Sequence, residues 1–186
     1  MLSGPATPLI LRPWRPGDEA AALKAFADPE MARQGGPMAD AAEAARWVES
    51  MSWKTSREHG FVFAAVTPRD VPIATVAATN VDRHDCGWVW YWTTAEARGG
   101  GVASDALAAL TPWLHDEAGL FRLELGHRVN NPASGRVAAR AGFAPEGLQR
   151  SKLHYDGTRF DVQRHARLTT DPRPAPRRKV KIVPAR

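Results

Sequence analysis

The stretch that governs the fold is residues 98–103, Arg-Gly-Gly-Gly-Val-Ala, which separates a strand-like segment from a long helical segment. Glycines let the backbone bend where a side chain would block it. The first turn of the following helix has unpaired N–H groups and the positive end of the helix dipole. Arg98 adds a permanent cation that can pair with phosphate. The stretch is therefore a candidate anion cradle, and the simpler alternative is a plain strand-to-helix turn.

Two other phosphate-binding loops are excluded by the letters themselves. No Gly-Lys-Ser or Gly-Lys-Thr follows the glycines, so this is not a Walker loop. The chain also lacks Gly-x-Gly-x-x-Gly at the start of a βαβ unit, so a dinucleotide-binding fold is unsupported.

The patterns on both sides of the cradle alternate between strands and helices. Expected strands are residues 9–12, 61–67, 73–79, 87–93, 122–126, 144–153 and 159–168. Expected helices are residues 18–27, 40–57, 102–114 and 131–141, with a break at Asp28-Pro29. Pro112 predicts a kink or an early stop in the third helix. The order predicts a mixed α/β domain, with a mostly antiparallel central sheet of six or seven strands and about four helices.

Composition places the chain among ordinary soluble domains. It has 186 residues, 44% hydrophobic and 24% charged. No apolar run approaches the roughly 18 residues that cross a bilayer, and the first residues lack the features of a signal peptide. Cys86 is the single cysteine, which excludes an internal disulfide and a cysteine-rich metal site. We expect a cytoplasmic protein without a membrane partner or a metal.

The net charge of +5 is concentrated at the end of the chain. We divide the chain into a domain at residues 1–170 and a basic, Pro- and Arg-rich tail at residues 171–186. The tail lacks apolar periodicity, so we expect it to be flexible, with no strand from Val180, Ile182 and Val183. A ribosome- or RNA-associated role for the tail is an alternative, but interleaved aromatic residues are missing, and nucleic acid is not the favoured partner.

Two blocks of the sequence resemble the GNAT superfamily of N-acetyltransferases. Arg98-x-x-Gly101-x-Ala103 is similar to its pyrophosphate-binding motif, Gln/Arg-x-x-Gly-x-Gly/Ala. Asn131-x-x-Ser134, followed by Gly-Phe at residues 142–143, is similar to the subgroup of ribosomal-protein N-terminal acetyltransferases. The resemblance covers residues 9–168 and implies the GNAT acyl-CoA N-acyltransferase fold.

The resemblance also implies an activity. The cosubstrate would be acetyl-CoA or another short acyl-CoA, and a primary amine would attack the thioester directly. The acceptor would be a protein N-terminus or a small amine. A CoA-binding module without transfer activity is the alternative. The oligomeric state stays open, a homodimer included.

Carried over residue by residue, the resemblance places the acyl-CoA contacts. They fall on Trp92, Thr93, Thr94, Arg98, Gly99, Gly100, Gly101, Val102, Ala103, Asn131 and Ser134. Residues 92–94 would pair through their backbone with the pantetheine arm. Asn131 would bond the same arm, or would only cap its helix.

The candidate general acid is Ser134, whose hydroxyl would protonate the leaving thiolate. Many family members use a Tyr where this chain has Ala138, so that route is absent. A serine that only bonds its own helix backbone is the competing interpretation. The subgroup often carries a Glu at the position where this chain has Trp88. The remaining candidates for the general base are Glu124, Asp85 and His84. The alternatives are that these three are solvated surface charges and that a water chain carries the proton.

Tryptophans are the third feature of interest. Trp88, Trp90 and Trp92 share one face of a strand by alternation. They either pack the sheet or form an aromatic wall of the acceptor cleft, which Trp47 and Trp53 of the preceding helical segment would join. Cys86 is interpreted as a small packed residue rather than a nucleophile.

Overall fold

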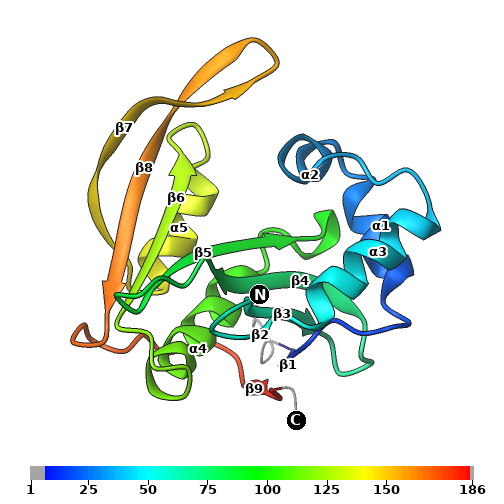
Figure 1. Cartoon of the computed structure of the whole chain (residues 1–186), viewed down its shortest axis with the longest axis horizontal. Coiled ribbons are helices and arrows are strands. Elements are labelled where there is room, and N and C mark those ends of the chain that lie inside the picture. The colour runs from blue at the N-terminus through cyan, green and yellow to red at the C-terminus, as the bar shows by residue number, and fades with distance from the viewer. Residues whose placement is uncertain (1–6, 185–186) are drawn as a thin grey trace, which may run out of the picture.

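The computed structural model describes residues 7–184 and builds them around one large sheet (Figure 1). In chain order the elements are β1 (Leu9–Arg12), α1 (Glu19–Phe26), α2 (Pro29–Gly35), α3 (Ala41–Ser52), β2 (Thr55–Ser56), β3 (Gly60–Val66), β4 (Pro72–Thr79), β5 (Cys86–Thr93), the 3-10 helix η1 (Ala95–Ala97), α4 (Val102–Asp116), β6 (Arg122–Arg128), α5 (Pro132–Arg140), β7 (Ala144–Tyr155), β8 (Thr158–Leu168) and β9 (Val180–Ile182). Each predicted strand and each predicted helix is present. The helix predicted over residues 40–57 ends earlier, at Ser52, and residues 55–56 of that range form β2; α2 and η1 are additional to the four helices expected.

The sheet is mixed and mostly antiparallel, as expected. Its order is β7-β8-β6-β5-β4-β3-β1-β9, with β2 added beside β3, and it contains 9 strands rather than six or seven. Only the pairs β5–β6 and β1–β9 run parallel among the described strands. The additional strands are short: β2 has 2 residues and β9 has 3, too few for an alternating pattern to be visible in the sequence.

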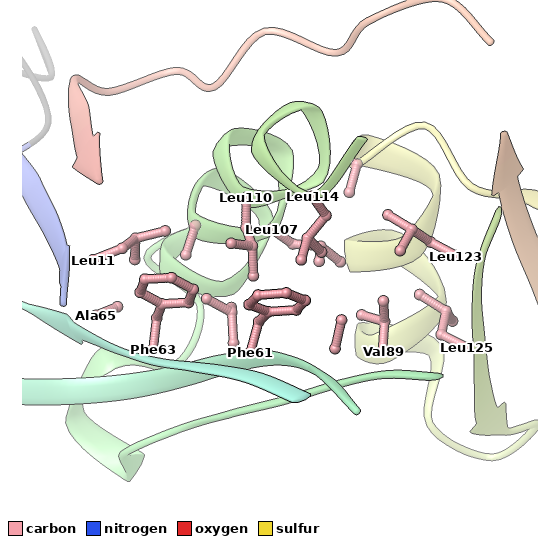
Figure 2. Packing of buried hydrophobic residues seen from close by; sticks show 14 of the residues in the cluster. Leu11, Phe61, Phe63, Ala65, Val89, Leu107, Leu110, Leu114, Leu123 and Leu125 are labelled. Carbon is pink, nitrogen blue, oxygen red and sulfur yellow. The ribbon is translucent and has the colours of Figure 1, made fainter. Parts of the chain in front are cut away.

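Helices cover both faces of the sheet, α4 and α5 on one and α1 and α3 on the other (Figure 1). On the first face, Leu107, Leu110 and Leu114 of α4 pack against Phe61 and Phe63 of β3 (Figure 2). On the second face, fully buried Trp14 packs with Val48 of α3 and with the other side of β3. Burial of apolar surface on both faces fixes the sheet between the two helix layers.

The break expected at Asp28-Pro29 is confirmed, because α1 ends at Phe26. A further helix, α2, begins directly after it: the Asp28 side chain accepts bonds from the N–H groups of Glu30 and Met31, and Pro29 occupies the first turn. Of the two outcomes expected at Pro112, a kink or an early stop, the early stop does not occur, since α4 continues to Asp116. Buried Leu110 and Leu114 on either side of the proline hold this part of the helix on the core.

The expectation that Val180, Ile182 and Val183 form no strand was also wrong. Val180–Ile182 is strand β9, which pairs in parallel with β1 at Leu9, Ile10 and Leu11. Val180 and Ile182 also pack against the main core, which gives the strand an apolar face. This end of the tail is therefore part of the sheet.

Candidate functional site

The most open part of the sheet lies between β5 and β6. These strands pair only at Cys86–Arg122, Gly87–Leu123 and Trp88–Glu124. Beyond that point each keeps its other neighbour: β5 pairs with β4 as far as Thr93, and β6 pairs with β8 as far as Arg128. Within the described residues, the facing edges of β5 and β6 thus diverge without a strand between them. Such an edge can pair with an extended ligand through the backbone.

The predicted cradle follows directly after this edge. Trp92 and Thr93 end β5, and the backbone N–H of Thr94 donates to Ile73 O at 2.9 Å, which holds the exit of the strand. Gly99 and Gly101 have φ angles of 74° and 77°, in the left-handed region that glycine favours. Gly101 is the N-cap of α4 and supplies no side-chain cap, so the first-turn amides of the helix are left for another acceptor. These residues fit an anionic ligand such as pyrophosphate.

Arg98 is engaged from the other side. Its guanidinium Nη1 donates to Asp28 Oδ2 at 3.0 Å, and this bond holds the pKa of Asp28 below its usual range. Asp28 is also the N-cap of α2. The predicted phosphate-binding cation therefore connects the cradle to α2 in this structure.

Asn131 and Ser134 lie together at the start of α5. Asn131 Oδ1 accepts a hydrogen bond from the Ser134 N–H at 3.1 Å, so the side chain caps the helix, one of the two roles predicted for it. The Ser134 hydroxyl is 2.7 Å from the Tyr91 hydroxyl, which also donates to Ser134 O at 3.0 Å. Ser134 thus bonds across to the diverging strand β5.

Tyr91 is a site residue that the sequence did not reveal. Burial raises the pKa of Tyr91 to about 12, so the phenol keeps its proton at neutral pH. Its position opposite to the tryptophan face follows from alternation along β5. No sequence signal, however, connects it to α5, which begins 41 residues later by number (132 − 91).

The candidate bases occupy different places, and His84 lies next to Asp85 in the turn before β5. Glu124 lies opposite Trp88 at the last paired position before the strands diverge, and its oxygens accept bonds from Arg122 at 2.7 Å and from Arg164 at 2.5 Å. Asp85 lies in the turn before β5 and pairs with Arg57. Asp85 directly precedes Cys86, the first residue of β5, so it lies at the end where β5 and β6 are paired, before the divergence that begins after Trp88.

The tryptophans divide into two groups. Trp92 and Trp47 join Trp14 and Phe26 in one aromatic cluster, in which Trp14 and Trp47 rings are 4.8 Å apart. Trp90 packs against the same face and donates its indole N–H to Thr79 Oγ1 at 3.1 Å.

The other tryptophans lie outside this cluster. Trp88 lies under the Arg164 guanidinium, 4.5 Å from ring centre to carbon. Trp53 is 52% exposed and contacts the His59 ring edge-to-face, so the prediction that it joins the wall was wrong.

Helix α2 extends from the cradle toward β6 and the β7–β8 hairpin. Arg128 of β6 pairs with Glu30 at 3.2 Å, and Arg33 pairs with Asp156 in the hairpin turn at 3.1 Å. These ion pairs place α2 beside the end of β6 and beside the turn of the β7–β8 hairpin.

Other chemistry receives less support. Burial, with the nearby Asp82 charge, raises the pKa of the Cys86 thiol, which disfavours a nucleophilic thiolate. Within residues 7–184, no three His, Cys, Asp or Glu side chains are grouped to hold a metal ion. No helix in the same range is both long and apolar enough to cross a membrane.

Residues 8–144 match the family described as "Acetyltransferase (GNAT) domain". The chain belongs to the GNAT family. The ribosomal-protein-serine acetyltransferase of Escherichia coli K12 is 34% identical over 80 residues, which are 43% of this chain and 45% of that protein. The chain thus spans less than half the length of this curated relative.

Solved GNAT-family structures share the fold. RimJ of Mycobacterium smegmatis, in complex with CoA-disulfide, is 26% identical with a TM-score of 0.71, over 86% of this chain and 81% of that one. The spermidine N-acetyltransferase of Vibrio cholerae, in complex with CoA and spermine, is 18% identical with a TM-score of 0.75, over 87% of this chain and 96% of that one. The latter likeness shows the fold alone.

Proposed function

We propose that this GNAT protein transfers an acetyl or other short acyl group from acyl-CoA to a primary amine. The observation that carries the proposal is the divergence of β5 and β6 beyond Trp88, which opens directly beside the cap-free start of α4. In acyl-CoA an extended pantetheine arm is followed by a charged pyrophosphate. The open edge of β5 fits the arm, and the start of α4 fits the pyrophosphate. Family membership over residues 8–144 supports the same cosubstrate.

Each part of the cosubstrate has a place in this arrangement. The pantetheine arm would pair with the β5 backbone at residues 92–94, and the pyrophosphate would meet the first-turn amides of α4. Gly99 offers open space there, since a Cβ at this position would have no neighbour within 4 Å. The thioester would then lie where β5 leaves β6, near Tyr91 and Ser134.

The transfer itself needs positioning and two proton movements. The amine nitrogen forms a bond to the acyl carbon, and the carbon–sulfur bond breaks. A backbone N–H of β5 would stabilise the oxyanion. Ser134 would protonate the departing thiolate and then take a proton back from solvent, while its bond to Tyr91, which keeps its own proton, holds the hydroxyl in place.

The amine must lose a proton before it attacks. Glu124 is better placed than Asp85 to receive it, because Glu124 lies at the point of divergence. Because the Glu124 oxygens already accept bonds from Arg122 and Arg164, we propose that the proton leaves the amine through a chain of water molecules that passes Glu124.

The acceptor would approach from the tryptophan face. Trp92 and Trp47 line this side with an apolar surface, and α2 and the β7–β8 hairpin flank it. The named relatives include enzymes for a ribosomal protein and for spermidine. A protein N-terminus is our first choice, and a small polyamine is the second.

The test combines binding and turnover. Calorimetry should detect acetyl-CoA binding, and release of free CoA should be measured with peptides that begin with Ser or Ala and with spermidine. Release that depends on one amine class would support the proposal and identify the acceptor. Binding without turnover of any amine would favour a CoA-binding module, and failure to bind any CoA thioester would overturn the assignment.

An RNA-binding role of the tail is less favoured by the contacts. Arg173 and Arg178 are paired with Asp116 and Asp105 in this structure, so these cations are already compensated. RNA binding that weakens with salt and disappears on deletion of residues 172–186 would support that role instead.

A further inference from the structure

The described part of the basic tail, residues 171–184, runs along α4 from its end to its beginning and then continues as β9. Arg173 pairs with Asp116 in the last turn of α4, at 2.7 Å. Arg177 and Arg178 reach Asp105 in the first turn, and β9 then pairs with β1 (Figure 1). The tail explains why α4 is buried on its outer side as well, at Ser104, Asp105 and Ala108.

Asp105 is the centre of this contact. It is 3% exposed, and its carboxylate accepts bonds from Arg178 Nε at 2.6 Å and from the Arg177 N–H at 2.8 Å. The Arg178 side chain is itself only 9% exposed. A buried carboxylate requires such partners, because removal of one leaves an uncompensated charge out of water.

The same carboxylate lies behind the cradle. Its Oδ2 would be 3.6 Å from a Cβ at Gly101, and the Arg178 guanidinium would be 3.7 Å from it. A negative charge in the first turn interacts favourably with the positive end of the helix dipole, but it repels a pyrophosphate that binds the same helix end. Pairing with Arg178 cancels that repulsion.

Arg178 also contacts the cradle directly. Its Nη2 donates to the carbonyl oxygen of Gly100. In a planar trans peptide the C=O and N–H point in opposite directions, so this bond turns the Gly101 N–H away from the tail. A cavity of about 80 Å³ beside it is lined by Gly101, Asp105, Arg140 and Arg177, among others, which adds two more cations on this side.

We propose that the segment of the tail that contacts Asp105, Arg177 and Arg178, is part of the acyl-CoA site, with Arg178 as a positioning residue that neutralises Asp105 and orients the Gly100–Gly101 peptide. The inference rests on the proposed function, because it assigns the tail to the cosubstrate that function requires. It also gives the basic residues of the tail a role toward a small anionic ligand rather than a polymer.

The test is a charge cycle on the two buried partners. Arg178→Met removes the cation and keeps much of the length, Asp105→Asn removes the repelling charge, and the double variant removes both. Calorimetry with acetyl-CoA should show affinity at least tenfold weaker for Arg178→Met and partly restored in the double variant, in which the contact of Arg178 with Gly100 stays lost. The coupling between the two changes separates charge neutralisation from independent effects.

An acyl donor without phosphate distinguishes an electrostatic effect on pyrophosphate binding from a general distortion of the site. S-acetylpantetheine lacks the pyrophosphate, so its kcat/KM should be unchanged in all three variants if Arg178 acts on the phosphate end. Arg173→Met is the matched control: it breaks an exposed ion pair at the other end of α4 and should leave acetyl-CoA affinity unchanged.

The outcomes are distinct. Unchanged affinity in Arg178→Met, or a double variant as weak as Arg178→Met, would overturn the inference. If Arg178→Met does not fold, Asp105→Asn alone decides, because equal or tighter acetyl-CoA binding supports the inference and clearly weaker binding overturns it. Failure of the unchanged protein to bind acetyl-CoA would instead overturn the proposed function, and this inference with it. If the protein binds acetyl-CoA but turns over no amine, the calorimetric affinities of the three variants still decide the inference by the same criteria.

Discussion

The two faces of the sheet are built from different materials. On the α4–α5 face, the proposed site consists largely of backbone: the open edge of β5, the left-handed glycines and the first turn of α4. On the α1–α3 face, it consists of side chains, with Trp47 and Trp92 in an aromatic cluster and ion pairs that hold α2.

This difference between the faces explains which substrate each part of the proposed site would select. Backbone amides read a feature common to all CoA thioesters, and a short motif of glycines is enough to place them. Side-chain packing reads one acceptor, and it depends on residues from several separate segments. Changes on the first face should therefore alter donor binding, and changes on the second should alter the choice of amine.

The largest expected effect comes from the cradle. Gly101→Val places a β-branched residue at φ 77°, where even an ordinary residue costs about 1–2 kcal/mol. To relieve this strain the loop must move, so affinity for acetyl-CoA should fall by at least about tenfold in calorimetry. Gly119→Val is the matched control, since Gly119 has a similar φ of 69° beyond the other end of α4. It should lower the melting temperature and spare affinity; equal loss in both variants would refute the cradle.

The next effect concerns the junction of the two faces. Ser134→Ala should lower kcat by about a hundredfold, the lower end of the range that general acids contribute, with little change in acetyl-CoA affinity. Tyr91→Phe should act in the same direction and less strongly, since Ser134 keeps its own proton.

The pH profile sharpens this prediction. The pKa of Tyr91, raised to about 12, means that its proton is kept below pH 10, so any fall in rate between pH 8 and 9 must come from another group. A parallel loss of kcat and affinity in Ser134→Ala would mean that Ser134 binds the cosubstrate and does not act as the acid.

The smallest expected effect is on the tryptophan face. Trp47→Phe keeps an aromatic ring in the cluster but reshapes the surface, so KM for the amine should rise by about two- to fivefold, in line with the modest worth of one aromatic contact. KM for acetyl-CoA should stay unchanged. Trp53→Phe, outside the cluster, should change neither value. A larger effect on acetyl-CoA than on the amine would contradict the division between the faces.

The sequence carries one half of the site much better than the other. The cradle, the helix after it and the Asn131–Ser134 turn depend on neighbouring residues, so their letters suffice for a prediction. The bond between Tyr91 and Ser134, the Arg98–Asp28 pair and the Arg178–Asp105 pair join residues 43, 70 and 73 positions apart. Only the packing of the whole sheet brings such partners together, and no local pattern encodes them.

The parallel pairing of β9 with β1 has a consequence for the order of assembly in the cell. Among the described strands, β1 is synthesised first and β9 last. Domains fold as synthesis proceeds. The edge of β1 must therefore wait, uncovered, until residues 180–182 have been translated.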